Sequence, residues 1–229
     1  MRQATTLSDV NQVASAIDAE ITALPACTTP NMRTIRRKYS RTLQPASPDF
    51  VLRLAKTLCA IDGYRWFAYE LLQRHKAAFA CLDAVALEDL GHGLNSWWTV
   101  DAFARILSGP AWLKGHVSDE VILTWAHSPN RWWRRVALVS TVALNVRSHG
   151  GKGDVPRTLR VCGVLVHDPE AMVAKALSWA LRELVIHDAE AVRAFLAEYD
   201  AVLAALAKRE VQNKLRTGVK HPGRKSHCR

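Results

Sequence analysis

Two stretches of the chain, SPNRWWRRVAL at residues 128–138 and DPEAMVAKALS at residues 168–178, follow one plan. Each starts with a polar residue suited to an N-cap and then a proline, which we expect at the first helical position, where its missing N–H is tolerated. Each has a basic residue at the same offset, Arg135 or Lys175, before small apolar residues. The offset of about 40 residues is typical of HEAT-type helical repeats. A looser copy, GYRWFAYELL, starts at Gly63.

The rest of the chain favours the same architecture. Apolar residues recur at helical spacing in most segments, and the breaks between them carry Gly, Pro, Asp and Ser. We find no convincing alternating strand pattern. The sequence therefore predicts an all-α fold, a short HEAT-like solenoid of antiparallel helix pairs with a concave basic groove for DNA. The alternative is that N-cap, proline and amphipathic helix recur by chance.

Length and charge limit the possibilities further. The chain has 229 residues, a formal net charge of +10 and 49% hydrophobic residues, which indicates a folded basic protein. We expect one domain over residues 1–220 and a basic, flexible tail over residues 221–229. A field of this sign favours a polyanion partner.

Several classes of protein have no support in the sequence. The five cysteines stand apart without metal-ligand spacing, so we expect no zinc site and no disulfide framework. The N-terminus lacks the apolar region of a signal peptide, and no apolar run reaches the length of a membrane span. No phosphate-binding loop, dinucleotide fingerprint or Ser/Cys nucleophile motif occurs. We expect a soluble, cytoplasmic monomer without cofactor or metal. The histidines at helix ends and in loops are interpreted as surface or capping residues.

One helix carries an unusual charge. The stretch GLNSWWTVDAFARIL, residues 93–107, places Trp97 four residues before Asp101, so both lie on one helix face. Asp101 is the only acid of this apolar stretch. Either the carboxylate lies in a core, or it stands beside an aromatic platform.

The tryptophans fit a simple core poorly. Two adjacent residues on a helix point about 100° apart, so at most one of Trp97/Trp98 and one of Trp132/Trp133 can be core. The helices with Trp132/Trp133 and Trp179 also carry cations. Aromatic side chains interleaved with Arg and Lys are typical of nucleic-acid surfaces.

The blocks SWWTVD (96–101), NRWWRRVAL (130–138) and KALSWALRE (175–183) carry a family resemblance. The chain resembles the AlkD-type DNA alkylation repair family, HEAT-like DNA glycosylases of bacteria that remove alkylated purines, over about residues 29–215. The resemblance implies that the lesion site contains Trp97, Asp101, Arg135 and Trp179, with Asn130 and Trp132 as framework. It implies double-stranded DNA with alkylated bases as the partner and a bacterial cytoplasmic, nucleoid-associated location.

The match departs from the family pattern in one place. The family form is closer to W-W-D-S-V-D, whereas here one residue is missing and Trp98 takes the position of the first acid. The relation of Trp97 to Asp101 survives. The departure bears on specificity more than on activity.

The reaction that the resemblance implies, removal of an alkylated purine, explains why one acid is enough. An N3- or N7-alkylated purine is cationic and leaves without protonation, so the carboxylate has only to stabilise the sugar cation and guide a water. We expect Arg135 to bind a phosphate beside the lesion through its guanidinium fork. Other cations expected to follow the DNA backbone are Arg36, Arg37, Lys38, Arg134, Lys175, Lys208 and Arg209.

Two alternative functions stay open at this point. A HEAT-like scaffold that binds DNA without catalysis predicts that Asp101 is dispensable. A protein-interaction module without a nucleic-acid role predicts DNA binding that depends little on salt. The lesion preference and the acceptance of bulky adducts are not specified by the sequence.

Overall fold

The computed structural model describes residues 9–222, and all regular structure in that range is helical. The prediction of an all-α fold is therefore confirmed. Contacts divide the chain into two compact units, one up to Gly93 and one from Leu94 onward. Each unit is described by itself below. The single domain over 1–220 stays a prediction, and the expected tail beyond Pro222 lies outside the described residues.

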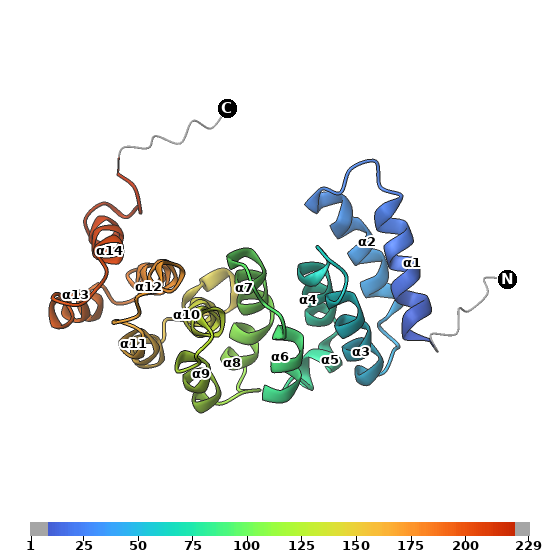
Figure 1. The fold of residues 1–229 in the computed structure, drawn as a ribbon, viewed down its shortest axis with the longest axis horizontal. Helices are drawn as coiled ribbons and strands as arrows, with labels where there is room; N and C mark the ends of the chain where they lie inside the picture. Colours follow the sequence, from blue (N-terminus) through green and yellow to red (C-terminus); the bar gives the residue numbers. More distant parts are fainter. Residues whose placement is uncertain (1–8, 223–229) are drawn as a thin grey trace. The chain divides into compact units, whose positions relative to one another are not determined.

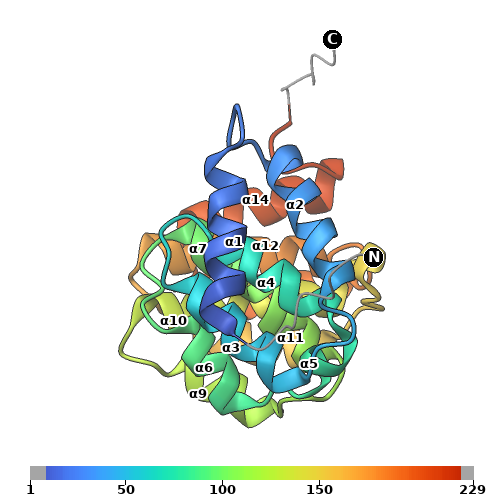
Figure 2. The same cartoon turned by 90° about the vertical axis from the view of Figure 1, so that its right-hand side faces the viewer.

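The first unit is a set of mutually packed helices. Its helices are α1 (Val10–Thr22), α2 (Thr29–Thr42), α3 (Pro48–Cys59), α4 (Arg65–Arg74), α5 (Lys76–Ala80) and α6 (Ala84–Gly91). α3 contacts α1 and α4, and α2 also packs against α4 (Figure 2). Polar side chains begin several of them: the hydroxyl of Ser47 accepts from the Phe50 N–H and the imidazole of His75 accepts from the Ala78 N–H.

The second unit begins with three helical segments that run on without a loop. These are α7 (Trp97–Phe103), the π-helical turn η1 (Ala104–Ser108) and α8 (Gly109–Leu113). The remaining elements are α9 (Asp119–Ala126), α10 (Arg131–Asn145), the 3-10 turn η2 (Arg147–His149), α11 (Val155–Val164), α12 (Ala171–Leu184), α13 (Ala189–Glu198) and α14 (Ala205–Thr217).

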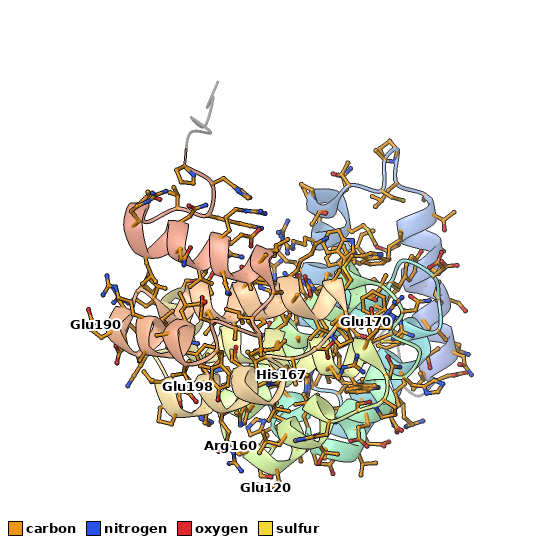
Figure 3. The ribbon with its side chains drawn as sticks, turned by 60° about the vertical axis from the view of Figure 1, so that its left-hand side comes forward. Glu120, Arg160, His167, Glu170, Glu190 and Glu198 are labelled. Carbon is orange, nitrogen blue, oxygen red and sulfur yellow. The ribbon has the colours of Figure 1, made fainter. Side chains whose placement is uncertain are left out.

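From α9 onward the helices form two rows (Figure 1). One row holds α10, α12 and α14, with contacts from α10 to α12 and from α12 to α14. The other holds α9, α11 and α13, and each of these helices packs against a member of the first row. Glu120 on α9 and Glu190 on α13 lie at the outside of this second row (Figure 3). Such stacking of helix pairs is the arrangement of HEAT-like repeats.

α10 is the central helix of the unit because most of its length is buried on every side. Every residue from Arg135 to Asn145 is buried. The polar residues among them, Ser140, Thr141 and Asn145, make hydrogen bonds inside the protein. The neighbours α7, η1, α8, α9, α11 and α12 all contact it.

The repeated helix starts differ in detail from our expectation. We expected Pro129 and Pro169 at the first helical position, and that is wrong: α10 begins at Arg131 after the N-cap Asn130, and α12 begins at Ala171 after Glu170. The cause is the local hydrogen bonding. The Asn130 carboxamide accepts from the Trp132 N–H at 2.9 Å and so takes over the capping.

The starts of α10 and α12 are also tied to each other. The guanidinium of Arg134 donates to the Asp168 carboxylate, with Nε 2.5 Å from Oδ2, and to the carbonyls of Ser128 and Pro129, each at 3.0 Å. Asp168 in turn accepts from the Glu170 N–H at 2.9 Å. Arg134 therefore joins one repeat to the next.

The π-helical turn brings α8 very close to α10. A Cβ added at Gly109 would lie 2.8 Å from the Ser140 carbonyl oxygen and 2.8 Å from the Ala143 Cβ. Beside it, the hydroxyls of Ser108 and Ser140 share a hydrogen bond of 2.7 Å. This close approach holds the segment that carries Asp101 against α10.

We expect Gly109→Ala to lower the free energy of unfolding by about 1–3 kcal/mol, because the added methyl group has to displace backbone. Gly163→Ala is the matched control. Its Cβ would meet the Tyr199 hydroxyl at an ordinary 3.7 Å, and alanine favours a helix by up to about 1 kcal/mol over glycine. Urea unfolding of both variants measures the difference. Equal stabilities would contradict the close packing.

Candidate active site

Trp97 begins α7, and Asp101 lies about one turn further along the same helix. They are four positions apart, so they share a helix face, and both line the same cavity of about 300 Å³. The Trp97 side chain is 56% exposed, whereas the Asp101 side chain is only 16% exposed. Trp98 is 42% exposed, so neither tryptophan of this pair belongs to the core. The structure therefore favours the aromatic platform with a carboxylate beside it over a charge in a core.

The Asp101 carboxylate forms an ion pair with the guanidinium of Arg135. Arg135 Nε lies 2.9 Å from Oδ1 and Nη2 lies 2.8 Å from Oδ2, which is the two-pronged geometry of the strongest ion pairs. Arg135 Nη1 also donates to the backbone carbonyl of Met172. The side chain of Arg135 is 7% exposed. Three helices, α7, α10 and α12, thus share one buried ion pair.

Arg135 differs here from the role that we expected. The fork that we assigned to a DNA phosphate is bound to Asp101, so a phosphate contact would have to use the N–H groups that remain. What the fork does in this structure is fix both oxygens of the carboxylate. Both partners still lie in the predicted site.

Trp179 completes the aromatic part of the cavity from α12. Its indole Nε1 donates to Glu183 Oε1 at 3.0 Å, which holds the plane of the ring. The guanidinium of Arg105, from η1, lies 5.6 Å from the ring centroid. The predicted members Trp97, Asp101, Arg135, Lys175 and Trp179 therefore line one cavity, although the sequence separates them widely. The remaining lining residues are Met172, Arg182, Glu210 and Lys220.

Glu210 is a second carboxylate of the cavity, and our sequence analysis missed it. It is 4% exposed, accepts from the Ser178 hydroxyl at 2.6 Å, and lies 3.0 Å from Lys220 Nζ. Arg182 Nε is 3.8 Å away. Burial by itself would raise the pKa of Glu210, but the hydrogen bonds from Ser178 and Lys220 and the two positive charges outweigh burial and lower it.

A signal for Glu210 does exist in the sequence. On α14 it lies on the same face as Ala207 and next to Val211, which are buried. An acid in the apolar register of a helix has to find donors inside the protein. Which cations pair with it, Arg182 and Lys220, is visible only in the folded chain.

The other tryptophan pair is divided between packing and surface. The ring of Trp133 packs against Phe103 at 5.9 Å and against Trp125 at 5.0 Å between centroids. Arg131 lies over the ring of Trp132, 4.9 Å from its centroid. Trp133 thus packs against α7 through Phe103, whereas Trp132 contacts the exposed Arg131.

Several of the cations predicted to contact DNA are not among the residues that line this cavity. Arg134 is 17% exposed and bound to Asp168, as described above. Lys208 lies 2.9 Å from Asp200 and shares a different cavity, of about 640 Å³, with Arg209. In the first unit, Lys38 Nζ lies 2.5 Å from Glu20 and Arg36 is buried. Contacts of these residues with DNA stay predictions.

Neither a metal site nor a membrane-spanning helix occurs in the part of the chain that the structure describes. Within residues 9–222, no group of three His, Cys, Asp or Glu side chains is placed to hold a metal ion. In the same range no helix is both long and apolar enough to cross a bilayer.

Stacked helix pairs and a cavity lined by two tryptophans, two paired carboxylates and several cations define a helical-repeat protein with a candidate active site. Comparison with protein families identifies it further. The family described as DNA alkylation repair enzyme matches residues 11–215, and the chain belongs to this family. The resemblance found in the sequence is thereby confirmed. Comparisons with curated proteins and with solved structures gave no match.

Glu210 gives a prediction on pH. Its pKa is lowered in the folded protein, so its contribution to stability is present above its ordinary value of 4.5 and is lost as the pH falls through the lower folded value. We expect Glu210→Gln to destabilise the protein by about 1.5–3 kcal/mol at neutral pH. The difference from the wild type should shrink as the pH falls below the ordinary value.

Urea unfolding across this pH range measures the effect. Glu190→Gln, in an exposed pair with Arg193 on α13, is the control and should change stability little at any pH. A Glu210→Gln penalty that does not change with pH would contradict the assignment of an ionised Glu210.

Proposed function

We propose that this protein is a DNA glycosylase that hydrolyses the N-glycosidic bond of cationic alkylated purines, the N3- and N7-alkylpurines, in duplex DNA. Membership in the DNA alkylation repair enzyme family supports DNA repair as the setting. The observation that carries the finer proposal is Asp101, held by Arg135 in a cavity with Trp97 and Trp179.

The chemistry requires little from a protein that has such a site. The ring of an N3- or N7-alkylpurine carries a positive charge, so the base departs as a neutral molecule without a general acid. What remains is positive charge on the deoxyribose and a water that has to reach the anomeric carbon. A fixed carboxylate stabilises the first and orients the second. A neutral base would need a proton donor as well.

The tryptophans contribute in two ways. Their ring faces attract the cationic base and sugar, each worth about 0.5–2 kcal/mol. They also exclude bulk water, which strengthens the attraction between the carboxylate and the sugar cation. Trp97 has an exposed ring for this purpose, and Trp179 has a plane fixed by Glu183.

Arg135 acts in this proposal as a positioning residue. It occupies one side of each carboxylate oxygen and leaves the other lone pairs of Asp101 available to the sugar and the water. Its own position is fixed by the Met172 carbonyl on α12. Because orientation contributes strongly to catalysis, a carboxylate held at both oxygens is better suited than one that rotates.

Three further cations of the cavity suit the DNA phosphates. Lys175 is exposed on α12, and Arg182 and Lys220 are oriented by Glu210. Together with Arg135 they outnumber the carboxylates Asp101 and Glu210. A site for a lesion in DNA needs this balance, since it has to hold phosphates beside a carboxylate that faces a cation.

The direct test is release of free base from duplex DNA that contains N7-methylguanine or N3-methyladenine. We expect the wild-type protein to release both. We expect Asp101→Asn to lower the rate on the order of a hundredfold or more, or about 2.7–4 kcal/mol of transition-state stabilisation, with DNA binding little changed. The Asn side chain keeps the shape and removes the charge.

Glu190→Gln serves as the control, because it removes an exposed carboxylate of the same unit that lies in neither cavity. It should release base at the wild-type rate. Binding of DNA without release of either base by the folded wild type would refute the glycosylase and leave a DNA-binding scaffold. Full activity of Asp101→Asn would show that another group stabilises the sugar cation.

Arg135→Lys and Lys175→Ala separate positioning from phosphate binding. Lysine keeps the charge of Arg135 but cannot grip both oxygens, so base release at saturating protein should fall by roughly tenfold to a hundredfold. Lys175→Ala should act mainly on affinity and flatten the slope of log affinity against log salt by about one unit.

Single-turnover assays at saturating protein and salt titrations of binding measure the two effects. If Arg135→Lys weakens binding but reacts at the wild-type rate once bound, Arg135 is a phosphate ligand and not a positioning residue.

A further inference from the structure

An arginine cluster in the first unit stands apart from the proposed active site. Helix α2, which packs against α4, carries three arginines within about one turn: Arg33, Arg36 and Arg37. On α4, Glu70 and Arg74 lie four residues apart and so share a face. We call Arg33, Arg36, Arg37 and Arg74 the α2–α4 arginine cluster.

Glu70 is paired with only part of this cluster. Its Oε1 lies 2.6 Å from Arg33 Nη2 and 3.0 Å from Arg33 Nε, so two N–H groups of Arg33 donate to the same oxygen. Arg33 also lies 5.7 Å from the centroid of the Trp66 ring. Arg37 donates to the Thr34 hydroxyl, which is neutral. Among the four arginines, contacts with the Glu70 carboxylate are made by Arg33 and Arg36.

Arg36 is the member whose environment is incomplete. It is only 8% exposed, and its buried Nε has no hydrogen-bond partner, although Glu70 Oε2 lies 3.3 Å away. The hydrogen bond of Nη1 to the Ser40 hydroxyl is long, at 3.3 Å. A buried charged donor left without an acceptor is costly and rare in native structures.

The electrostatics of Arg36 agree with this geometry. Burial lowers the pKa of Arg36, the Glu70 charge opposes that shift, and the neighbouring charges of Arg74, Arg37 and Arg33 add to it. The cluster is thus short of negative charge at the place where a donor is unsatisfied. An anion with several oxygens would supply that charge, and the exposed Arg33, Arg37 and Arg74 can donate to its oxygens.

We propose that the α2–α4 arginine cluster binds a phosphate group. Guanidinium groups match phosphate oxygens through paired N–H donors, and several arginines can share one phosphate. We assign the ligand to a phosphodiester of the DNA backbone. That assignment rests on the proposed function, whereas phosphate binding itself does not.

The first experiment follows the unfolding temperature of the full chain in inorganic phosphate against chloride at equal ionic strength. We expect phosphate to stabilise the wild type more than chloride does. Arg74→Ala should lose most of this increment. Arg53→Ala is the matched control, an exposed arginine of the same unit that pairs with Asp49 on its own helix and should keep the increment. Equal increments in the two variants would overturn the proposal.

Glu70→Gln tests the charge argument because it should change two quantities in opposite directions: stability without phosphate and stabilisation by phosphate. The variant should be less stable than the wild type without phosphate, because Arg33 and Arg36 lose their carboxylate. Its stabilisation by phosphate should be larger than that of the wild type, because the cluster then lacks its only paired acid among the described residues. A purely structural cluster gives the first effect without the second, and that result would overturn the proposal.

The source of the phosphate is identified with undamaged duplex DNA, so base release plays no part in the test. If the ligand is a backbone phosphodiester, Arg74→Ala flattens the slope of log affinity against log salt by about one unit relative to Arg53→Ala. A lost phosphate increment with an unchanged slope supports the site but assigns it to a free phosphate compound and overturns the DNA contact.

Discussion

The ion pair of Asp101 with Arg135 is the interaction on which the candidate active site depends. It joins α7 to α10, and the bond from Arg135 to the Met172 carbonyl extends it to α12. Buried ion pairs contribute little to net stability, because the cost of removing two charges from water offsets their attraction. Apolar side chains would fill the same space at least as well. The pair is therefore better explained by what it does to the carboxylate, which it fixes at both oxygens.

The two related helix starts show how one pattern yields two different roles. Arg135 and Lys175 occupy the same offset after the repeated start. Arg135 is buried because α12 packs over α10 and supplies the Met172 carbonyl, whereas Lys175 on α12 stays exposed and lines the cavity. The same repeat position thus yields a positioning residue in one repeat and a candidate phosphate contact in the next. Arg134, directly beside Arg135, instead ties the two starts together through Asp168.

Much of the fold and part of the site followed from the sequence. Helical periodicity and breaks at Gly and Pro are local properties, so they predicted the all-α fold, and the spacing of Trp97 and Asp101 predicted their shared face. The capping by Asn130 was missed because the choice between Ser128 and Asn130 depends on which side chain reaches the N–H groups of the first turn. Glu210 was missed because its donors lie on α12 and beyond the end of α14. Partners that meet only in the folded chain leave no mark in a linear pattern.

The net charge of +10 therefore cannot be mapped onto a binding face residue by residue. Several of the cations form ion pairs with acids of the protein itself: Arg134 with Asp168, Lys38 with Glu20 and Lys208 with Asp200. The charge of such a cation is already balanced within the protein, so its first role is structural and not the binding of DNA. An unbalanced cation behaves differently, because a charge that is partly removed from water attracts any anion that reaches it. In this protein the distinction depends on the distance from each cation to its nearest carboxylate and on whether that carboxylate is already shared, as Glu70 is between Arg33 and Arg36.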